Sequence, residues 1–193
     1  MRPGTKPALI GAALNLAIAA GIGVLRVTNG STGRNHAEGW LPTIAIVAAL
    51  AAPGVLALIG VATQRPVLYG AAGVACMPLV IVSIAAFPIL VPGALLIVAF
   101  AREQTVQPAP AWLTGVLLAG FPVPIVVGLW TLVTRTAEFT YNFAGGSEGG
   151  EYFTPGHAVL CIALVATDVV VAAAVAGLRP ATSATTSPSA CGS

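Results

Sequence analysis

The chain has 193 residues, of which 57% are apolar and 7% are charged, and its mean hydropathy is +0.94. Soluble domains carry about 25% charged residues, so the composition excludes an ordinary soluble protein, and the high apolar fraction excludes a disordered one. The net charge of +2 and the lack of a basic cluster exclude nucleic acid as a partner. The composition therefore predicts that the chain is embedded in the lipid bilayer. The bias toward Arg, Ala, Val and Gly is typical of a bacterial protein, here of the cytoplasmic membrane.

Apolar runs in the sequence mark the segments that can cross this bilayer, because about 20 apolar residues in a helix span its hydrocarbon core. We predict an all-α fold, a polytopic helical membrane bundle that forms a single domain over residues 1–180. A disordered polar tail of Ser, Thr, Ala and Pro is expected over residues 181–193. The predicted transmembrane helices cover residues 8–25, 41–62, 67–86, 88–103, 111–134 and 158–178.

The first of these spans also has the features of a signal peptide. Arg2 and Lys6 precede an apolar core, and the small residues at 17 and 19 fit a cleavage site after residue 19. The apolar run continues to Leu25, well past that site, which favours a retained span over a cleaved leader.

The stretch from Val67 to Ala101 has no charge and leaves two alternatives open. Its 35 residues would make a straight helix of roughly 50 Å, whereas the hydrocarbon core is about 30 Å thick. Two prolines and a glycine between Phe87 and Gly93 favour a turn, and therefore a hairpin of two short helices. The hairpin gives six spans, and the alternative, one long bent span, gives five.

The loop charges favour six spans. With six, both termini share one side of the membrane, and that side holds more basic residues than the other. The sets are Arg2, Lys6, Arg65, Arg102 and Arg179 on the side of the termini, and Arg26, Arg34 and Arg135 on the other side. With five spans, the basic residues divide evenly. Because cytoplasmic loops carry an excess of Lys and Arg, we predict six spans with both termini in the cytoplasm.

Asp168 is the first candidate for a functional residue. It is the only charged residue in the apolar run over 159–178, where a carboxylate costs about 2.5–3.5 kcal/mol on insertion scales. Asp168 shares a helix face with Ala172 and Ala176, and small residues at this spacing favour a helix interface over lipid. Three roles are open: a proton- or cation-coupling site, a neutral hydrogen-bonded packing residue, or a partner for a basic residue of another subunit.

Asn15 is the second candidate, because it is the only amide in the middle of a predicted span. If both termini share one side, Asn15 and Asp168 lie at comparable depth. An amide can donate to a carboxylate or accept from a carboxylic acid. We therefore predict that the first and last helices pack together, with Asn15 hydrogen-bonded to Asp168.

Prolines and one long loop carry further signals. Pro53-Gly54 and Pro78 interrupt predicted helices, which favours kinked packing, although broken helices also line the binding sites of transporters.

Between residues 135 and 157, Phe139, Tyr141 and Phe143 alternate with polar residues, a pattern typical of a short strand or an aromatic lip at the interface. Glu148, Glu151 and His157 in the same segment are too loosely spaced to predict a metal site.

The sequence carries no phosphate loop, nucleophile elbow or zinc-binding motif. We therefore expect no enzyme, no catalytic residue, no cofactor and no metal. Two classes of function stay open. One is a non-enzymatic interaction or accessory protein, a scaffold that packs beside other membrane subunits or self-associates. The alternative is a small proton- or cation-coupled carrier that uses Asp168. We favour the first because it requires no polar chemistry.

Overall fold

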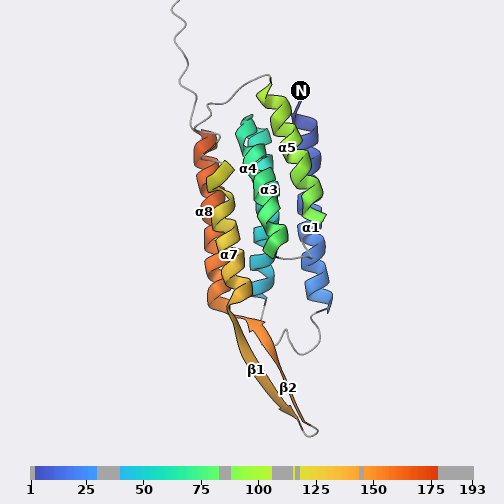
Figure 1. Cartoon of the computed structure of the whole chain (residues 1–193), viewed down its shortest axis with the longest axis vertical. Coiled ribbons are helices and arrows are strands. Elements are labelled where there is room, and N and C mark those ends of the chain that lie inside the picture. The colour runs from blue at the N-terminus through green and yellow to red at the C-terminus, as the bar shows by residue number, and fades with distance from the viewer. Residues whose placement is uncertain are drawn as a thin grey trace, which may run out of the picture.

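The computed structural model describes residues 3–29, 40–82, 88–105, 115, 118–143 and 146–177. These residues form six helices and one β-hairpin (Figure 1). The elements are α1 (Thr5–Asn29), α3 (Leu41–Thr63), α4 (Pro66–Val82), α5 (Leu90–Gln104), α7 (Pro122–Thr134), β1 (Thr136–Phe143), β2 (Gly146–Phe153) and α8 (Pro155–Gly177). The predicted polar tail, residues 181–193, lies outside the described residues.

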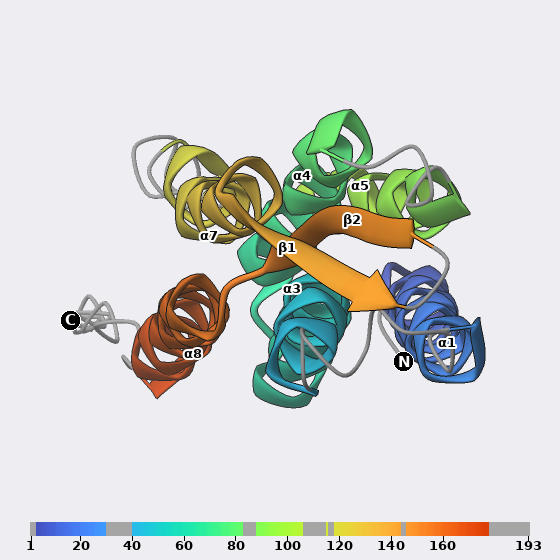
Figure 2. The ribbon, with the colours of Figure 1, turned by 90° about the horizontal axis from the view of Figure 1, so that it is seen from below.

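The helices form two layers of three, which are visible when the bundle is viewed along its long axis (Figure 2). One layer consists of α8, α3 and α1, with α3 in the middle, and the other consists of α7, α4 and α5, with α4 in the middle. Across the layers, α8 packs against α7, α3 against α4, and α1 against α5. Helix α3 therefore separates α1 from α8.

The chain runs back and forth between two ends of the bundle (Figure 1). We call the end at which α1 starts and α8 finishes the terminal end, and the opposite end, which carries the β-hairpin, the hairpin end. Helix α1 runs toward the hairpin end, and each later helix reverses the direction of the helix before it. As a result α3 and α8 are parallel neighbours, whereas α1 and α3 are antiparallel.

Three of the described helices are long and apolar enough to cross a membrane, judged by length and composition. They lie at Thr5–Thr28, Leu41–Thr63 and Pro155–Ala174, and two shorter apolar helices cover Pro66–Leu79 and Leu118–Thr134. The chain is therefore a membrane protein, as its composition predicts. Because α4, α5 and α7 are shorter, the count of six spans stays a prediction.

The charge-free stretch from Val67 to Ala101 consists of two separate helices, α4 and α5, and not of one bent helix. The two helices pack closely because glycines lie at their interface. A Cβ atom added to Gly93 would lie 2.7 Å from Cys76 Cβ, and one added to Gly73 would lie 2.7 Å from Ile97 Cγ1. In Figure 1 this pair stops well short of the hairpin end.

The core is built largely from small side chains on α3, the middle helix of its layer. The most apolar part of α3 is 56% buried, whereas the most apolar parts of α1 and α8 are each 28% buried. Small residues permit close approach of helix backbones in membranes. The buried residues of α3 are Pro42, Ala45, Ala49, Leu50, Ala52, Pro53, Gly54, Leu56, Ala57 and Gly60.

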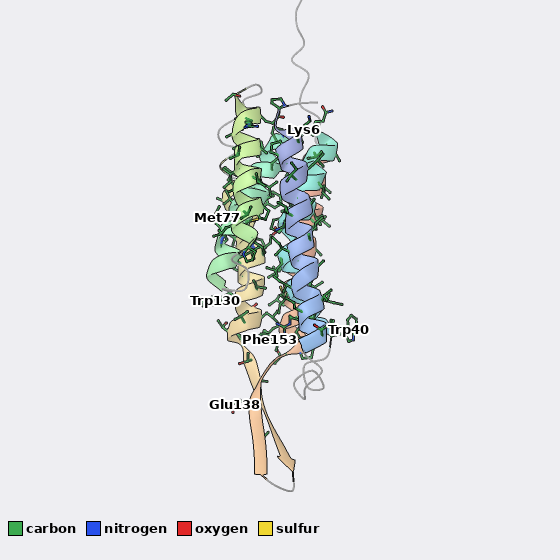
Figure 3. All side chains as sticks on the ribbon, turned by 90° about the vertical axis from the view of Figure 1, so that its right-hand side faces the viewer. Lys6, Trp40, Met77, Trp130, Glu138 and Phe153 are labelled. Carbon is green, nitrogen blue, oxygen red and sulfur yellow. The ribbon has the colours of Figure 1, made fainter. Side chains whose placement is uncertain are left out.

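The segment after α7 forms an antiparallel β-hairpin, which adds a two-stranded sheet to the predicted all-α bundle. Strands β1 and β2 pair from Thr136 opposite Phe153 to Phe143 opposite Gly146. The alternation around Tyr141 therefore does mark a strand. The hairpin extends beyond the ends of the helices (Figure 1), and Figure 3 shows Glu138 on this extension, away from the bundle.

Candidate functional site at the proline break of α3

The candidate site begins with a break in the backbone hydrogen bonds of α3. Pro53 lies inside this helix. Since proline has no N–H group, the carbonyl of Ala49 lacks its usual helical donor, and the proline ring crowds the same carbonyl. The next residue, Gly54, donates its N–H to Asn15 Oδ1 on α1 at 2.9 Å. A Cβ at position 54 would lie only 2.7 Å from that oxygen, so the glycine permits the bond.

Asn15 is fully buried and joins three helices. Its oxygen accepts the N–H of Gly54 on α3, and its Nδ2 donates to Cys76 Sγ on α4 at 3.9 Å. The predicted hydrogen bond between Asn15 and Asp168 is therefore wrong. The physical reason is the position of α3, which lies between α1 and α8 (Figure 2).

Asp168 faces the interior of the bundle. It is 5% exposed and belongs to a stripe of buried residues on α8, in which the spacing alternates between three and four. The stripe consists of Ala158, Cys161, Val165, Asp168 and Ala172. Residues at this spacing share one helix face, and α3 and α7 are the helices that pack against α8.

The depth of Asp168 follows from a contact two turns earlier. Cys161 Sγ donates to the carbonyl of Ala45 on α3 at 3.8 Å. Parallel helices advance by the same distance per residue, so seven residues further along both helices the side chain of Asp168 is set against the carbonyl of Ala52. Asp168 thus lies beside the turn that Pro53 interrupts.

Asn15 and Asp168 therefore lie at the same level on two sides of α3. These contacts agree with the predicted comparable depth, whereas the predicted contact is wrong. Sequence periodicity places each residue along its own helix, but the neighbour of each helix depends on how the six helices are ordered in the two layers.

The carboxyl group of Asp168 lacks an evident partner. Its Oδ2 is buried and has no hydrogen bond within the described part of the chain. Neither α3 nor α7 contains an ionisable side chain, so the helices that pack against α8 offer no opposite charge. A group in this setting can hold a proton or accept a cation, the two chemistries that the site supports.

Glu103, the last residue of the predicted span 88–103, is a second buried acid. It lies near the end of α5 and is fully buried. Its Oε1 accepts the N–H of Gly4 at 2.9 Å, just before α1 starts, while its Oε2 is buried without a hydrogen bond among the described residues. An anion is favourable at a helix N-terminus. No pattern in the sequence pairs two positions 99 residues apart.

The base of the β-hairpin is held by contacts at the hairpin end. The guanidinium of Arg26, near the end of α1, lies 5.3 Å from the ring centroid of Phe153, the last residue of β2. The Thr154 hydroxyl and His157 Nδ1 share a hydrogen bond at the start of α8. Within the described ranges, no group of three or more His, Cys, Asp and Glu side chains could hold a metal ion.

No protein-family model, curated protein or solved structure is detectably similar to this chain.

Proposed function

We propose that this chain is a non-enzymatic accessory membrane protein that binds another protein through its β1–β2 hairpin. The observation that carries the proposal is the projection of the hairpin beyond the helices (Figures 1 and 3). Each strand has eight residues, and the two strands pair with each other. An isolated two-stranded hairpin is at best marginally stable in water, and its outer edges present unpaired backbone groups. A partner that covers an edge would stabilise it.

The charge of the hairpin supports a basic partner. Residues 136–153 contain three acidic residues and no basic one. The register pairs Glu138 directly with Glu151, and like charges directly opposite each other destabilise a sheet. Lys or Arg side chains of a bound partner would be complementary to these acidic residues.

The proposal is tested by photo-crosslinking in cells from a reactive residue placed at position 138, which is exposed on the hairpin. The expected result is a discrete adduct with one protein, identified by mass spectrometry. The matched control carries the same residue at Trp130, which is 55% exposed on the surface of α7, and should give no such adduct. Failure to form an adduct at position 138, in cells that express the protein at its normal level, would rule out hairpin docking.

The proposed setting is the cytoplasmic membrane of a bacterium, with six membrane-embedded helices and both termini in the cytoplasm. The described charges support this orientation, since Lys6, Arg65 and Arg102 lie at the terminal end, and Arg26 and Arg135 at the hairpin end. Figure 3 shows Lys6 and Trp40 near opposite ends of the bundle. An exposed Trp at a helix start fits the membrane–water interface.

The orientation is tested with Cys191 and a membrane-impermeant maleimide in intact cells. Cys76 and Cys161 are buried, so they should not react, and a Cys191→Ser variant checks this. Labelling that requires permeabilisation supports a cytoplasmic C-terminus. Labelling of intact cells would contradict the proposed orientation.

A second candidate function is a proton- or cation-coupled carrier that uses Asp168. The observation in its favour is the buried Oδ2 atom without a hydrogen bond in the described residues. Proteoliposomes that contain the purified protein should then show a proton or sodium flux, and Asp168→Asn should abolish it while Thr167→Leu, an exposed neighbour on α8, should not. Equal fluxes in empty liposomes would remove this candidate.

A further inference from the structure

We infer that Asp168 is a carboxylic acid whose O–H donates to the backbone carbonyl that Pro53 leaves without a donor on α3. The inference depends on neither proposed function. It assigns a proton-holding site at the interface of α3 and α8, and it gives the buried aspartate a partner that an ionised carboxylate could not use.

Burial and the lack of a nearby positive charge favour the protonated form of Asp168, which is the form that can donate a hydrogen bond. Asp168 is 5% exposed, and a buried carboxylate without a partner is costly, so the neutral form is favoured. The described lengths of α3 and α7, which pack against α8, contain no ionisable residue. On α8 itself the titratable side chains are His157 and Cys161, about 16 Å and 10 Å away along the helix axis.

The acceptor side follows from the position of Pro53. The carbonyl of Ala49 would normally accept from the N–H of residue 53, and proline has none. Carbonyl groups in α3 point toward its C-terminus, which is the terminal end of the bundle. The side chain of a helical residue tilts toward the N-terminus of its helix. From its place against the carbonyl of Ala52, the longer carboxyl group of Asp168 therefore inclines toward the carbonyl of Ala49, three residues nearer the N-terminus of α3.

Protonation decides whether the bond can exist. A carboxylate oxygen can only accept a hydrogen bond, and a backbone carbonyl can also only accept, so the ionised form places two acceptors next to each other. A carboxylic acid has one O–H to donate. This also accounts for the buried Oδ2, which finds no donor in the described part of the chain.

With this bond, the break in α3 is closed from both sides. On the α1 side, Asn15 Oδ1 accepts the N–H of Gly54. On the α8 side, Asp168 donates to the carbonyl of Ala49. Side chains of α1 and α8 then both bond α3 at the turn that contains Pro53. Removal of the proton from Asp168 would break one of these bonds and loosen α8 from α3.

A double-mutant cycle between Pro53 and Asp168 tests the inference. In the otherwise unchanged protein, Asp168→Leu removes the donor and should raise the equilibrium constant for unfolding in mixed detergent–SDS micelles by about 3- to 20-fold. Pro53→Ala restores an N–H that can bond the carbonyl of Ala49. In that background, the same Asp168→Leu substitution should have less than half the effect on a logarithmic scale.

The matched control is Thr167→Leu, which removes a polar side chain from an exposed position of the same turn. Its effect should be independent of residue 53. An Asp168→Leu effect that is equally large with proline and with alanine at position 53 would overturn the inference, because the cost would then have no connection to the free carbonyl.

Asp168→Asn provides a second test that does not require a large loss of stability. An amide can donate to the same carbonyl, so this variant should unfold within about twofold of the unchanged protein, a difference below the mean for membrane hydrogen bonds. The infrared difference spectrum, unchanged protein minus Asp168→Asn, should contain the C=O stretch of a protonated carboxylic acid. A difference spectrum with only ionised-carboxylate bands would overturn the inference whatever the stability result.

Discussion

At the scale of single residues, the fully buried polar side chains accept hydrogen bonds from backbone N–H groups at a helix break or just before a helix start. Asn15 accepts the N–H of Gly54 beside a proline, and Glu103 accepts the N–H of Gly4 before a helix starts. In hydrocarbon, water is not present to satisfy such groups, so side chains must do so. This explains why two polar side chains that are fully buried lie at the ends or breaks of helices.

Replacement of Asn15 by Leu should destabilise the bundle. The substitution removes the acceptor that the N–H of Gly54 has on α1, and a lost hydrogen bond of this kind costs about 1–2 kcal/mol. Unfolding in mixed detergent–SDS micelles measures the loss. Leu14→Ala, at an exposed position of the same turn, is the control and should change the free energy of unfolding by less. An Asn15→Leu variant as stable as the control would mean that the bond has no net stabilising effect.

Gly54 and Gly21 should respond in opposite ways to alanine. At position 54 the added Cβ would lie 2.7 Å from Asn15 Oδ1 and 2.9 Å from Leu16 Cγ. At position 21, no atom of the described residues lies within 4 Å, apart from the chain neighbours and the nearby backbone of the same helix. We expect Gly54→Ala to lower the free energy of unfolding by about 1–3 kcal/mol through overpacking, and Gly21→Ala to raise it by up to about 1 kcal/mol through helix propensity. The same micelle assay compares the two variants, and equal effects would contradict the close approach of α1 and α3.

At the scale of elements, the α4–α5 pair is shorter than its neighbours. The 17 residues of α4 and 15 of α5 correspond to about 25 Å and 22 Å, against a hydrocarbon core of about 30 Å. A Cβ added to Gly11 of α1 would lie 3.1 Å from the carbonyl oxygen of Pro92. Gly11 lies about 9 Å from the start of α1, so α5 starts beside the first third of α1, and α1 continues for about 27 Å beyond Gly11.

This length difference predicts the accessibility of Val91 in the first turn of α5. Val91 is 61% exposed on the bundle surface, but at this depth it should face lipid. A Val91→Cys variant in a Cys191→Ser background should therefore resist impermeant maleimide from both sides of the membrane. Trp40→Cys, at a residue 70% exposed before α3, is the control and should react from the outside. Fast reaction of the Val91→Cys variant from the outside would show that the start of α5 is not embedded in lipid.

At the scale of the whole molecule, the bundle and the hairpin are separate units joined at one base. Within the described residues the two strands pair with each other, and Arg26 over Phe153 is the contact that ties their base to α1. The helices, in contrast, pack across two layers through α3 and α4 (Figure 2). Stability should therefore depend on the layers and not on the hairpin.

Excision of the hairpin tests this separation. A variant in which residues 138–151 are replaced by a short Gly-Ser linker keeps Phe153 and the start of α8. Its helical circular dichroism and its free energy of unfolding in mixed micelles should remain within about 0.5 kcal/mol of the unchanged protein, as for surface changes. A large loss of helicity would show that the hairpin is part of the folding unit, and would weaken its proposed role as a docking element.

The sequence by itself determined the membrane setting and the helical class, and it favoured the division of Val67–Ala101 into two helices, because hydropathy and proline position act locally along the chain. It also indicated the strand around Tyr141 and the unusual burial of Asp168 and Asn15. These features depend on each segment alone, through length, period and backbone chemistry.

Only the tertiary structure decided which helices are neighbours. The order of the two layers puts α3 between α1 and α8, so Asn15 bonds Gly54 and Cys76 while Asp168 lies on the other side of the same proline break. It also brought Glu103 to Gly4, across 99 residues of sequence. Apolar helices rich in Ala, Val and Leu can pack against each other in many orders. The choice depends on steric fit at glycines and on the pairing of a few buried polar groups, and both require contacts between segments that are distant in the chain.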